Sequence, residues 1–148
     1  WTSPITFVAS ANCGLYCGAK IDFVDIDSRT YNLCPRALEA KLIEAEKSGK
    51  LPKVVVAVHL CGQSCDMESL SLLSRKYGFK IIEDASHAIG SKYKDEFVGC
   101  GVRNVTRLRG TGSVFAKRLS LQLCKDYSLG SKGIGLLANI LVVHTVII

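Results

Sequence analysis

Two adjacent acids at the end of an apolar segment are the residues best placed to do chemistry. Glu83 and Asp84 follow residues 79–82 (FKII) and stand just before His87. A carboxylate at the end of a buried strand needs a partner, because an unpaired buried carboxylate is neutralised instead. A protonated ring nitrogen of a bound cofactor is one such partner, and its protonation makes the ring an electron sink. From these residues alone, the alternative is that Asp84 caps a helix and that His87 is an ordinary hydrogen-bonded residue.

The strands that must carry these acids can be recognised from their apolar patterns. Residues 53–60 (KVVVAVHL) form a continuous apolar run, which is typical of a strand buried on both faces of a parallel sheet, and residues 79–84 (FKIIED) are expected to form the next buried strand. Residues 21–26 (IDFVDI) alternate apolar and acidic side chains, which suits a short strand. In a sheet of this kind, ligands bind beyond the carboxyl ends of the strands, where Asp84 would lie.

Helical periodicity separates these strands. A first helix is expected to begin at Pro35 and to end near Gly49, with one apolar face made of Leu38, Leu42 and Ala45. A second helix is expected to be capped by Asp66, to end at Gly78 and to bury Met67, Leu70, Leu73 and Tyr77. The alternation predicts an α/β fold with an open, mostly parallel sheet and flanking helices.

The net charge of +6 does not indicate a nucleic-acid-binding surface. Residues 1–99 hold twelve Lys/Arg and twelve Asp/Glu, whereas residues 100–148 hold seven Lys/Arg and one acid, Asp126. Nucleic-acid binding needs an organised basic face with stacking aromatics, and residues 100–148 contain only Phe115 and Tyr127 as aromatics. Residues 134–148 are strongly apolar, but fifteen residues are fewer than the roughly 20 that a membrane helix needs. We therefore expect neither nucleic acid nor a membrane as a partner.

The cysteines favour a reducing compartment. Seven cysteines form no even set for a disulfide framework and no secretory signal accompanies them, so a cytoplasmic protein with reduced thiols is expected. Two C-x3-C pairs, Cys13/Cys17 and Cys61/Cys65, lie near His59 in the second case, but zinc sites more often use C-x2-C spacing. We therefore expect small buried apolar residues here and no metal.

Three motifs in order resemble a known enzyme family. TSPITFVASAN near the start, VAVHLCGQSCDM around residue 60 and EDASHAIG around residue 86 are similar to the DegT/DnrJ/EryC1/StrS sugar aminotransferases. These enzymes have the pyridoxal phosphate fold of type I, so the resemblance implies a partial large domain in residues 1–99. It also implies that Asp84 pairs with the pyridine nitrogen, that His87 lies beside the cofactor and that Phe7 stacks on its ring. The second motif most resembles the branch that makes 4-amino-4,6-dideoxy-N-acetyl-altrosamine on UDP, a step towards pseudaminic acid.

The family's cofactor-binding lysine is less clearly matched. The family places it in a segment like S-F-H-x-x-K, followed by T-G-E-G-G. Ser120 and Lys125 reproduce the offset from serine to lysine, and Gly130 and Gly133 follow at the family's glycine positions. The resemblance then makes Lys125 the Schiff-base lysine and Ser120 a phosphate ligand. Lys117 better suits the distance from Asp84 but lacks these neighbours, and a third reading is that neither lysine is catalytic.

The resemblance implies an activity and leaves one alternative open. The expected reaction moves an amino group from glutamate, through pyridoxal phosphate, to a nucleotide-linked 4-keto-6-deoxy sugar for cell-surface glycans, in a homodimer. The family's upstream phosphate loop and its small C-terminal domain have no counterpart in residues 1–148, so an incomplete chain is expected. Residues 100–148, basic and then apolar, either continue the large domain or come from a shifted reading frame. The alternative function is an inactive scaffold or assembly partner that keeps the large-domain core.

Overall fold

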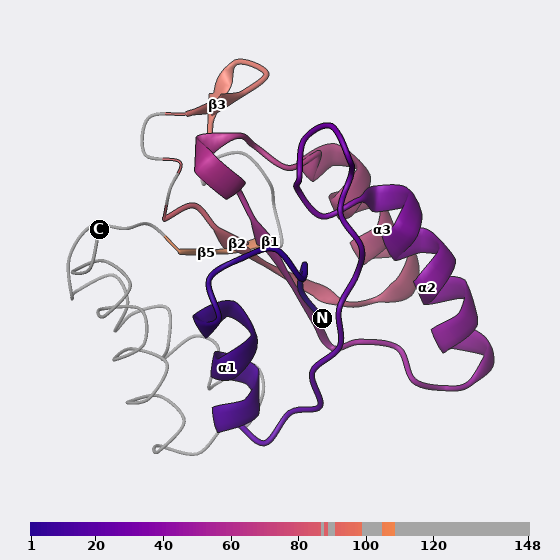
Figure 1. Cartoon of the computed structure of the whole chain (residues 1–148). Coiled ribbons are helices and arrows are strands. Elements are labelled where there is room, and N and C mark those ends of the chain that lie inside the picture. Colours follow the sequence, from indigo (N-terminus) through magenta and orange to yellow (C-terminus); the bar gives the residue numbers. More distant parts are fainter. Residues whose placement is uncertain (87, 89–90, 99–104, 109–148) are drawn as a thin grey trace.

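A three-stranded parallel sheet forms the centre of the computed structural model, which describes residues 1–86, 88, 91–98 and 105–108. The strands are β1 (Val54–Val58), β2 (Lys80–Asp84) and β5 (Val105–Leu108), in the spatial order β1-β2-β5. Both pairings are parallel, with Asp84 level with Val58 on one side and with Leu108 on the other. The predicted α/β class with a parallel sheet is confirmed, and Asp84 ends the central strand of these three (Figure 1).

The first residues of the chain extend this sheet on the side of β1 that is opposite β2. Thr2 forms parallel bridges with both Val56 and Phe23, so the start of the chain lies between β1 and residues 22–24. The predicted strand over residues 21–26 is therefore wrong in extent, because only single bridges form there. Ile26 turns away to bridge Leu33 in antiparallel fashion, around a turn in which the Asp27 carboxylate accepts hydrogen bonds from two backbone N–H groups.

Two helices cover one face of the sheet, as predicted. They are α2 (Pro35–Lys47) and α3 (Met67–Tyr77), and they lie together on one side of the strands in Figure 1. Every residue predicted for their apolar faces is buried: Leu38, Leu42 and Ala45 in α2, and Met67, Leu70, Leu73 and Tyr77 in α3. Together with Val55, Ala57 and Ile81 of the strands, most of these residues form the main hydrophobic core.

A third helix, α1 (Ala9–Tyr16), lies on the opposite side of the strands from α2 and α3 (Figure 1) and was not predicted. Its sequence, ASANCGLY, has no charged residue and no separation of apolar and polar faces, so periodicity gives no signal. Gly14 allows the helix to approach the Ile21 side chain so closely that a Cβ at this position would collide with it. None of the residues of α1 is buried in the described structure.

Short elements complete the described part of the chain. A 3-10 turn, η1 (Leu60–Gly62), follows β1, and the strands β3 (Lys92–Tyr93) and β4 (Glu96–Phe97) form an antiparallel hairpin. β5 lies within residues 100–148, the segment predicted as a divergent tail, and its pairing with β2 continues the sheet. Within the described ranges, no helix has the length and apolar character needed to cross a membrane.

Asp66 joins the start of α3 to the β3–β4 hairpin. Its carboxylate accepts hydrogen bonds from Ser69 N at 3.2 Å and from the Tyr93 hydroxyl at 2.8 Å, which confirms the predicted N-cap. Burial by itself would raise the pKa of Asp66, but hydrogen bonds from Ser69 and Tyr93 and the charge of Lys94 outweigh it and lower that pKa. A depressed folded-state pKa means that the ionised form stabilises the fold above the unfolded-state pKa, and that this stability is lost as the pH falls through the folded-state value.

We expect Asp66→Ala to lower the free energy of unfolding by about 1 kcal/mol at neutral pH, because α3 loses its N-cap. The difference from the unsubstituted chain should shrink as the pH falls below the ordinary range of an aspartate, where the carboxylate is protonated in both states. Urea unfolding at a series of pH values measures both effects. Asp66→Asn, which keeps a capping side chain, is the matched control, and a loss as large as that of the alanine variant would contradict the capping argument.

Candidate functional site

The two adjacent acids of β2 point to opposite faces of the sheet. Glu83 is level with Ala57, and its side chain lies on the face that α2 and α3 cover. Asp84 is level with Val58 and shares the other face with it, the side on which α1 lies. Both acids are buried, with 3% of Glu83 and 7% of Asp84 exposed. Strand alternation therefore places the Glu83 carboxylate in the core. The Asp84 carboxylate lies at the carboxyl end of the sheet, on the face opposite the core.

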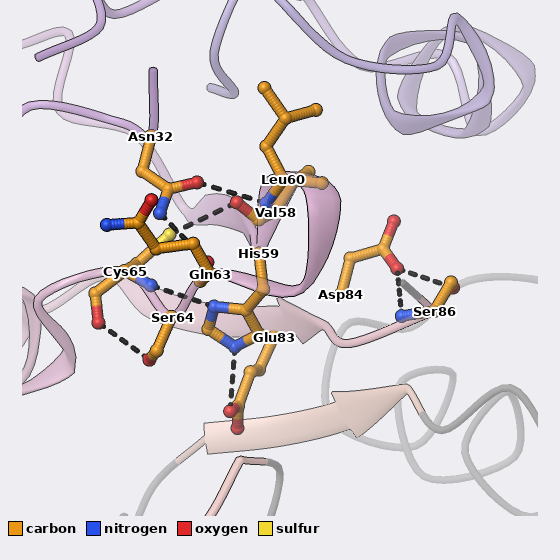
Figure 2. Close-up of polar contacts among 10 residues, drawn as sticks. All are labelled: Asn32, Val58, His59, Leu60, Gln63, Ser64, Cys65, Glu83, Asp84 and Ser86. Atoms are coloured by element: carbon orange, nitrogen blue, oxygen red, sulfur yellow. Dashed lines mark hydrogen bonds and ion pairs between the residues drawn. The ribbon is translucent and has the colours of Figure 1, made fainter. Parts of the chain in front are cut away.

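Asp84 is held in place by hydrogen bonds to one of its two carboxylate oxygens. Oδ1 accepts hydrogen bonds from Ser86 N at 3.1 Å and from Ser86 Oγ at 2.6 Å, which close a turn just after β2 (Figure 2). The backbone oxygen of Asp84 accepts the N–H of His59 at 3.0 Å. Within the described part of the chain, Oδ2 receives no hydrogen bond. A buried carboxylate oxygen without a protein donor is a fit for a cationic N–H group of a ligand.

Cys13 of α1 lies near enough to Asp84 for the charge of Asp84 to affect the pKa of the Cys13 thiol. Partial burial, the neighbouring Cys17 and the charge of Asp84 together raise the pKa of the Cys13 thiol to about 11, although hydrogen bonds with the backbone lower it. The thiol donates to the backbone oxygen of Ser10 at 3.3 Å. The α1 helix therefore borders the same face of the sheet end as Asp84, with a protonated and unreactive thiol on that side.

Phe7 is placed between the first sheet residues and α1. It follows Thr2, which is level with Val56 in the sheet, and it lies two residues before the start of α1. Phe7 is 43% exposed. The segments that carry Phe7 and Asp84 thus leave the same, carboxyl, end of the sheet with β1 between them. An exposed aromatic ring and a buried acid at one sheet end fit a flat, cationic heterocycle, as in pyridoxal phosphate.

The other residues predicted for the site lie outside the described residues. They are His87, Ser120, Lys125 and the alternative lysine, Lys117. Their roles remain predictions.

The sequence analysis missed a buried hydrogen-bonded pair, His59 and Glu83, next to Asp84. The Nε2 atom of His59 lies 2.9 Å from Glu83 Oε1, and 0% of the histidine side chain is exposed. In the sequence, His59 stands out only as a neighbour of the Cys61/Cys65 pair. His59 comes one residue after β1, and by strand alternation it points to the same face as Ala57, with which Glu83 is paired. This alternation could have indicated the pair from the sequence.

The cysteines near His59 differ from one another in burial. Cys65 is buried and its thiol donates to the backbone oxygen of Val58 at 3.1 Å, which confirms the expected buried residue. Cys61 is exposed, and Cys13 and Cys17 of the first pair are only partly buried, so the expectation of buried residues was wrong for these three. Among the described residues, no group of three or more His, Cys, Asp and Glu could hold a metal ion.

Comparisons with known proteins agree with this geometry. The chain matches the DegT/DnrJ/EryC1/StrS aminotransferase family over residues 1–107. "Putative pyridoxal phosphate-dependent aminotransferase EpsN" of Bacillus subtilis is 46% identical over 94 residues, 64% of this chain and 24% of the relative. The UDP-4-amino-4,6-dideoxy-N-acetyl-beta-L-altrosamine transaminase of Campylobacter jejuni is 42% identical over 99 residues, 66% of this chain and 25% of the relative.

A solved structure with the same fold comes from Helicobacter pylori. It is PseC, an aminotransferase involved in the biosynthesis of pseudoaminic acid, with a TM-score of 0.58 and 35% sequence identity. The similarity covers 66% of this chain and 24% of PseC. The chain thus spans about a quarter of the length of the curated relatives it matches. The family match over most of its length, on a parallel α/β sheet that ends in a buried aspartate, shows that this chain belongs to the DegT/DnrJ/EryC1/StrS aminotransferase family.

Proposed function

We propose that this chain is the cofactor-binding part of a pyridoxal phosphate-dependent sugar aminotransferase. Its reaction transfers an amino group from glutamate to a nucleotide-linked 4-keto-6-deoxy sugar, for the synthesis of cell-surface polysaccharide. The observation that carries the proposal is the buried Asp84 carboxylate at the carboxyl end of β2, whose Oδ2 takes no hydrogen bond from the described residues.

The role of Asp84 follows from its surroundings. A carboxylate that is 7% exposed and held at Oδ1 by Ser86 can place Oδ2 against a ring N–H and keep that nitrogen protonated. Bound pyridoxal phosphate supplies an electron sink for the carbon that exchanges its amino group. The side chain of Phe7 covers one face of the ring and excludes water from it, and His87 stands beside the ring. These assignments use the cofactor that the family shares.

Lys125 and Ser120 complete the proposed site. Lys125 binds the cofactor and moves protons at the reacting carbon, and the Ser120 hydroxyl donates to its phosphate. The amine of this lysine must be neutral to react with the cofactor. Lys117 is the competing candidate for the same role.

The substrate, the assembly and the compartment are proposed from chemistry and from the relatives' names. One relative is named as a UDP-linked aminosugar transaminase and PseC as an aminotransferase for pseudoaminic acid, so a nucleotide-linked keto-sugar is the proposed acceptor. We place the protein in the cytoplasm, in keeping with the free thiols of all five described cysteines, and as a homodimer.

Borohydride reduction in the presence of one equivalent of pyridoxal phosphate tests the proposal. We expect peptide mapping by mass spectrometry to find the reduced cofactor on Lys125, and the label to disappear in Lys125→Ala but to persist in Lys117→Ala. A label on Lys117 instead would move the lysine assignment. No site-specific label on any lysine would sink the enzymatic proposal in favour of the scaffold alternative, a protein that keeps the sheet without the lysine chemistry.

A further inference from the structure

A fully buried histidine joins the ends of the two strands beside the proposed cofactor site. The backbone N–H of His59 donates to the backbone oxygen of Asp84 at 3.0 Å, and this hydrogen bond connects the end of β1 to the end of β2. The His59 ring, which is not exposed at all, lies 2.9 Å from the Glu83 carboxylate through Nε2. One residue therefore contacts both the backbone of Asp84 and the side chain of Glu83, and Figure 2 shows the second of these contacts.

The hydrogen bonds around the ring define its protonation state. Nδ1 lies 3.0 Å from the backbone N of Cys65, whose N–H can only donate, so Nδ1 is an acceptor and carries no proton. The ring proton is then on Nε2, which donates it to Glu83 Oε1. His59 is thus neutral, with both ring nitrogens used by partners of the required kind.

The loop that follows His59 is held by hydrogen bonds from the side chains of Asn32 and Cys65. Asn32, which is 3% exposed, accepts the N–H of Leu60 at 3.0 Å and donates to the backbone oxygen of Gln63 at 2.9 Å. The Cys65 thiol donates to Val58 O at 3.1 Å, just before His59. Between these anchors Cys61 adopts a left-handed backbone conformation with φ of 52°, which a non-glycine residue keeps only when its surroundings enforce it. The position of the His59 ring is therefore set from several sides.

We propose that His59 is a positioning residue for Asp84. In a strand, fixing the side chain of one residue on one face also fixes the direction of the next residue on the other face. The His59–Glu83 hydrogen bond and the His59–Asp84 backbone hydrogen bond together set how the Asp84 carboxylate is aimed. A binding group displaced by about 1 Å loses much of its effect, so the aim of Asp84 matters for a rigid ligand. The inference deepens the proposed function, because it rests on Asp84 as the ligand of the pyridine nitrogen.

Two substitutions separate the hydrogen bonds of His59 in the full 148-residue chain. His59→Asn keeps an acceptor near the Nδ1 position for the Cys65 N–H, but it is too short to reach Glu83. His59→Gln places an amide N–H near the Nε2 position and keeps the bond to Glu83. Ser74→Ala is the matched control, because it also removes a buried hydrogen bond, from Ser74 to Phe79 O, at the other end of β2.

Two readouts report on Asp84 itself. The first is the 13C resonance of the Asp84 carboxyl carbon in the chain without any ligand, identified by its absence in Asp84→Asn. The second is the affinity for pyridoxamine 5′-phosphate, measured by calorimetry. We expect His59→Asn to shift the resonance and to weaken the affinity about tenfold, the lower end of the loss seen when a hydrogen-bond partner of a metal ligand is removed. His59→Gln should largely restore both readouts, and Ser74→Ala should leave both unchanged although it lowers stability.

The outcomes discriminate between positioning and mere structural support. If His59→Asn and Ser74→Ala destabilise the chain and neither moves the Asp84 resonance, the inference is overturned. Should His59→Asn fail to fold, Glu83→Met severs the same hydrogen bond from the other side and must give the same shift. If the unsubstituted chain does not bind pyridoxamine 5′-phosphate, the proposed function fails, whereas the carboxyl resonance still decides the role of His59.

Discussion

Replacing Asp84 by asparagine is expected to weaken the binding of pyridoxal phosphate by roughly one hundredfold or more. The substitution keeps the shape of the side chain and the acceptor for Ser86, but it removes the negative charge that faces the ring nitrogen. Breaking a buried ion pair by removing one partner costs about 3–5 kcal/mol, and about 1.4 kcal/mol corresponds to tenfold in affinity. Titration of the cofactor, followed by its absorbance and by calorimetry, measures the loss.

Asp84→Asn should stabilise the fold of the chain without cofactor, although it weakens cofactor binding. A buried carboxylate whose Oδ2 takes no donor from the described residues is costly, so Asp84→Asn should raise the free energy of unfolding by about 1 kcal/mol. Urea unfolding with and without cofactor measures both effects on one sample. Asp66→Asn is the control, because it makes the same chemical change at a helix cap and should leave cofactor affinity unaltered. Equal affinity of Asp84→Asn and the unsubstituted chain would remove Asp84 from the site.

The largest effect on stability is expected at the interface between α3 and the sheet. Leu70 is 0% exposed and belongs to the main core, so Leu70→Ala should lower the free energy of unfolding by about 2–5 kcal/mol, since both transfer energy and packing are lost. Leu72, two residues further along the same helix, is 61% exposed. Leu72→Ala should change stability by less than about 0.5 kcal/mol.

This pair of variants checks the orientation of α3 directly. Both substitutions have the same effect on helix propensity, so their difference reports burial alone. Chemical denaturation followed by circular dichroism gives the two free energies. Similar losses for both leucines would mean that α3 does not pack on the sheet through the face that contains Leu70.

The helices and strands that were predicted well are those with a strong local pattern. α2 and α3 have an apolar stripe at helical spacing, with Pro35 at the start of one and Asp66 and Gly78 at the ends of the other. β1 is buried from Val55 to Val58 and is a continuous apolar run, and β2 has buried residues on both faces, Ile81 and Glu83 on one and Asp84 on the other. In each case a short stretch of sequence contains the physical cause of the structure, namely burial of one face or capping of one end.

Elements without such a pattern were predicted poorly. α1 is uncharged and mixes apolar and polar residues around its axis, so nothing in its sequence distinguishes a helix face. The alternating residues 21–26 suggested a strand, yet they form only single bridges because the turn at Asp27 diverts the chain. β5 lies in a segment without periodicity and is defined by its pairing with β2. Partners distant in sequence decide these cases.

The two adjacent acids at the end of β2 show what sequence and tertiary structure each contribute. The sequence by itself determined that Glu83 and Asp84 end a buried strand, and its motifs indicated the aminotransferase family, because both depend on residues close together in the chain. Only the tertiary structure decided which partner each acid has. Glu83 meets His59, 24 positions away, on the core face, whereas Asp84 turns to the other face with one oxygen free of described donors. The reason is that strand alternation assigns the faces, but the register between parallel strands determines what lies on each face.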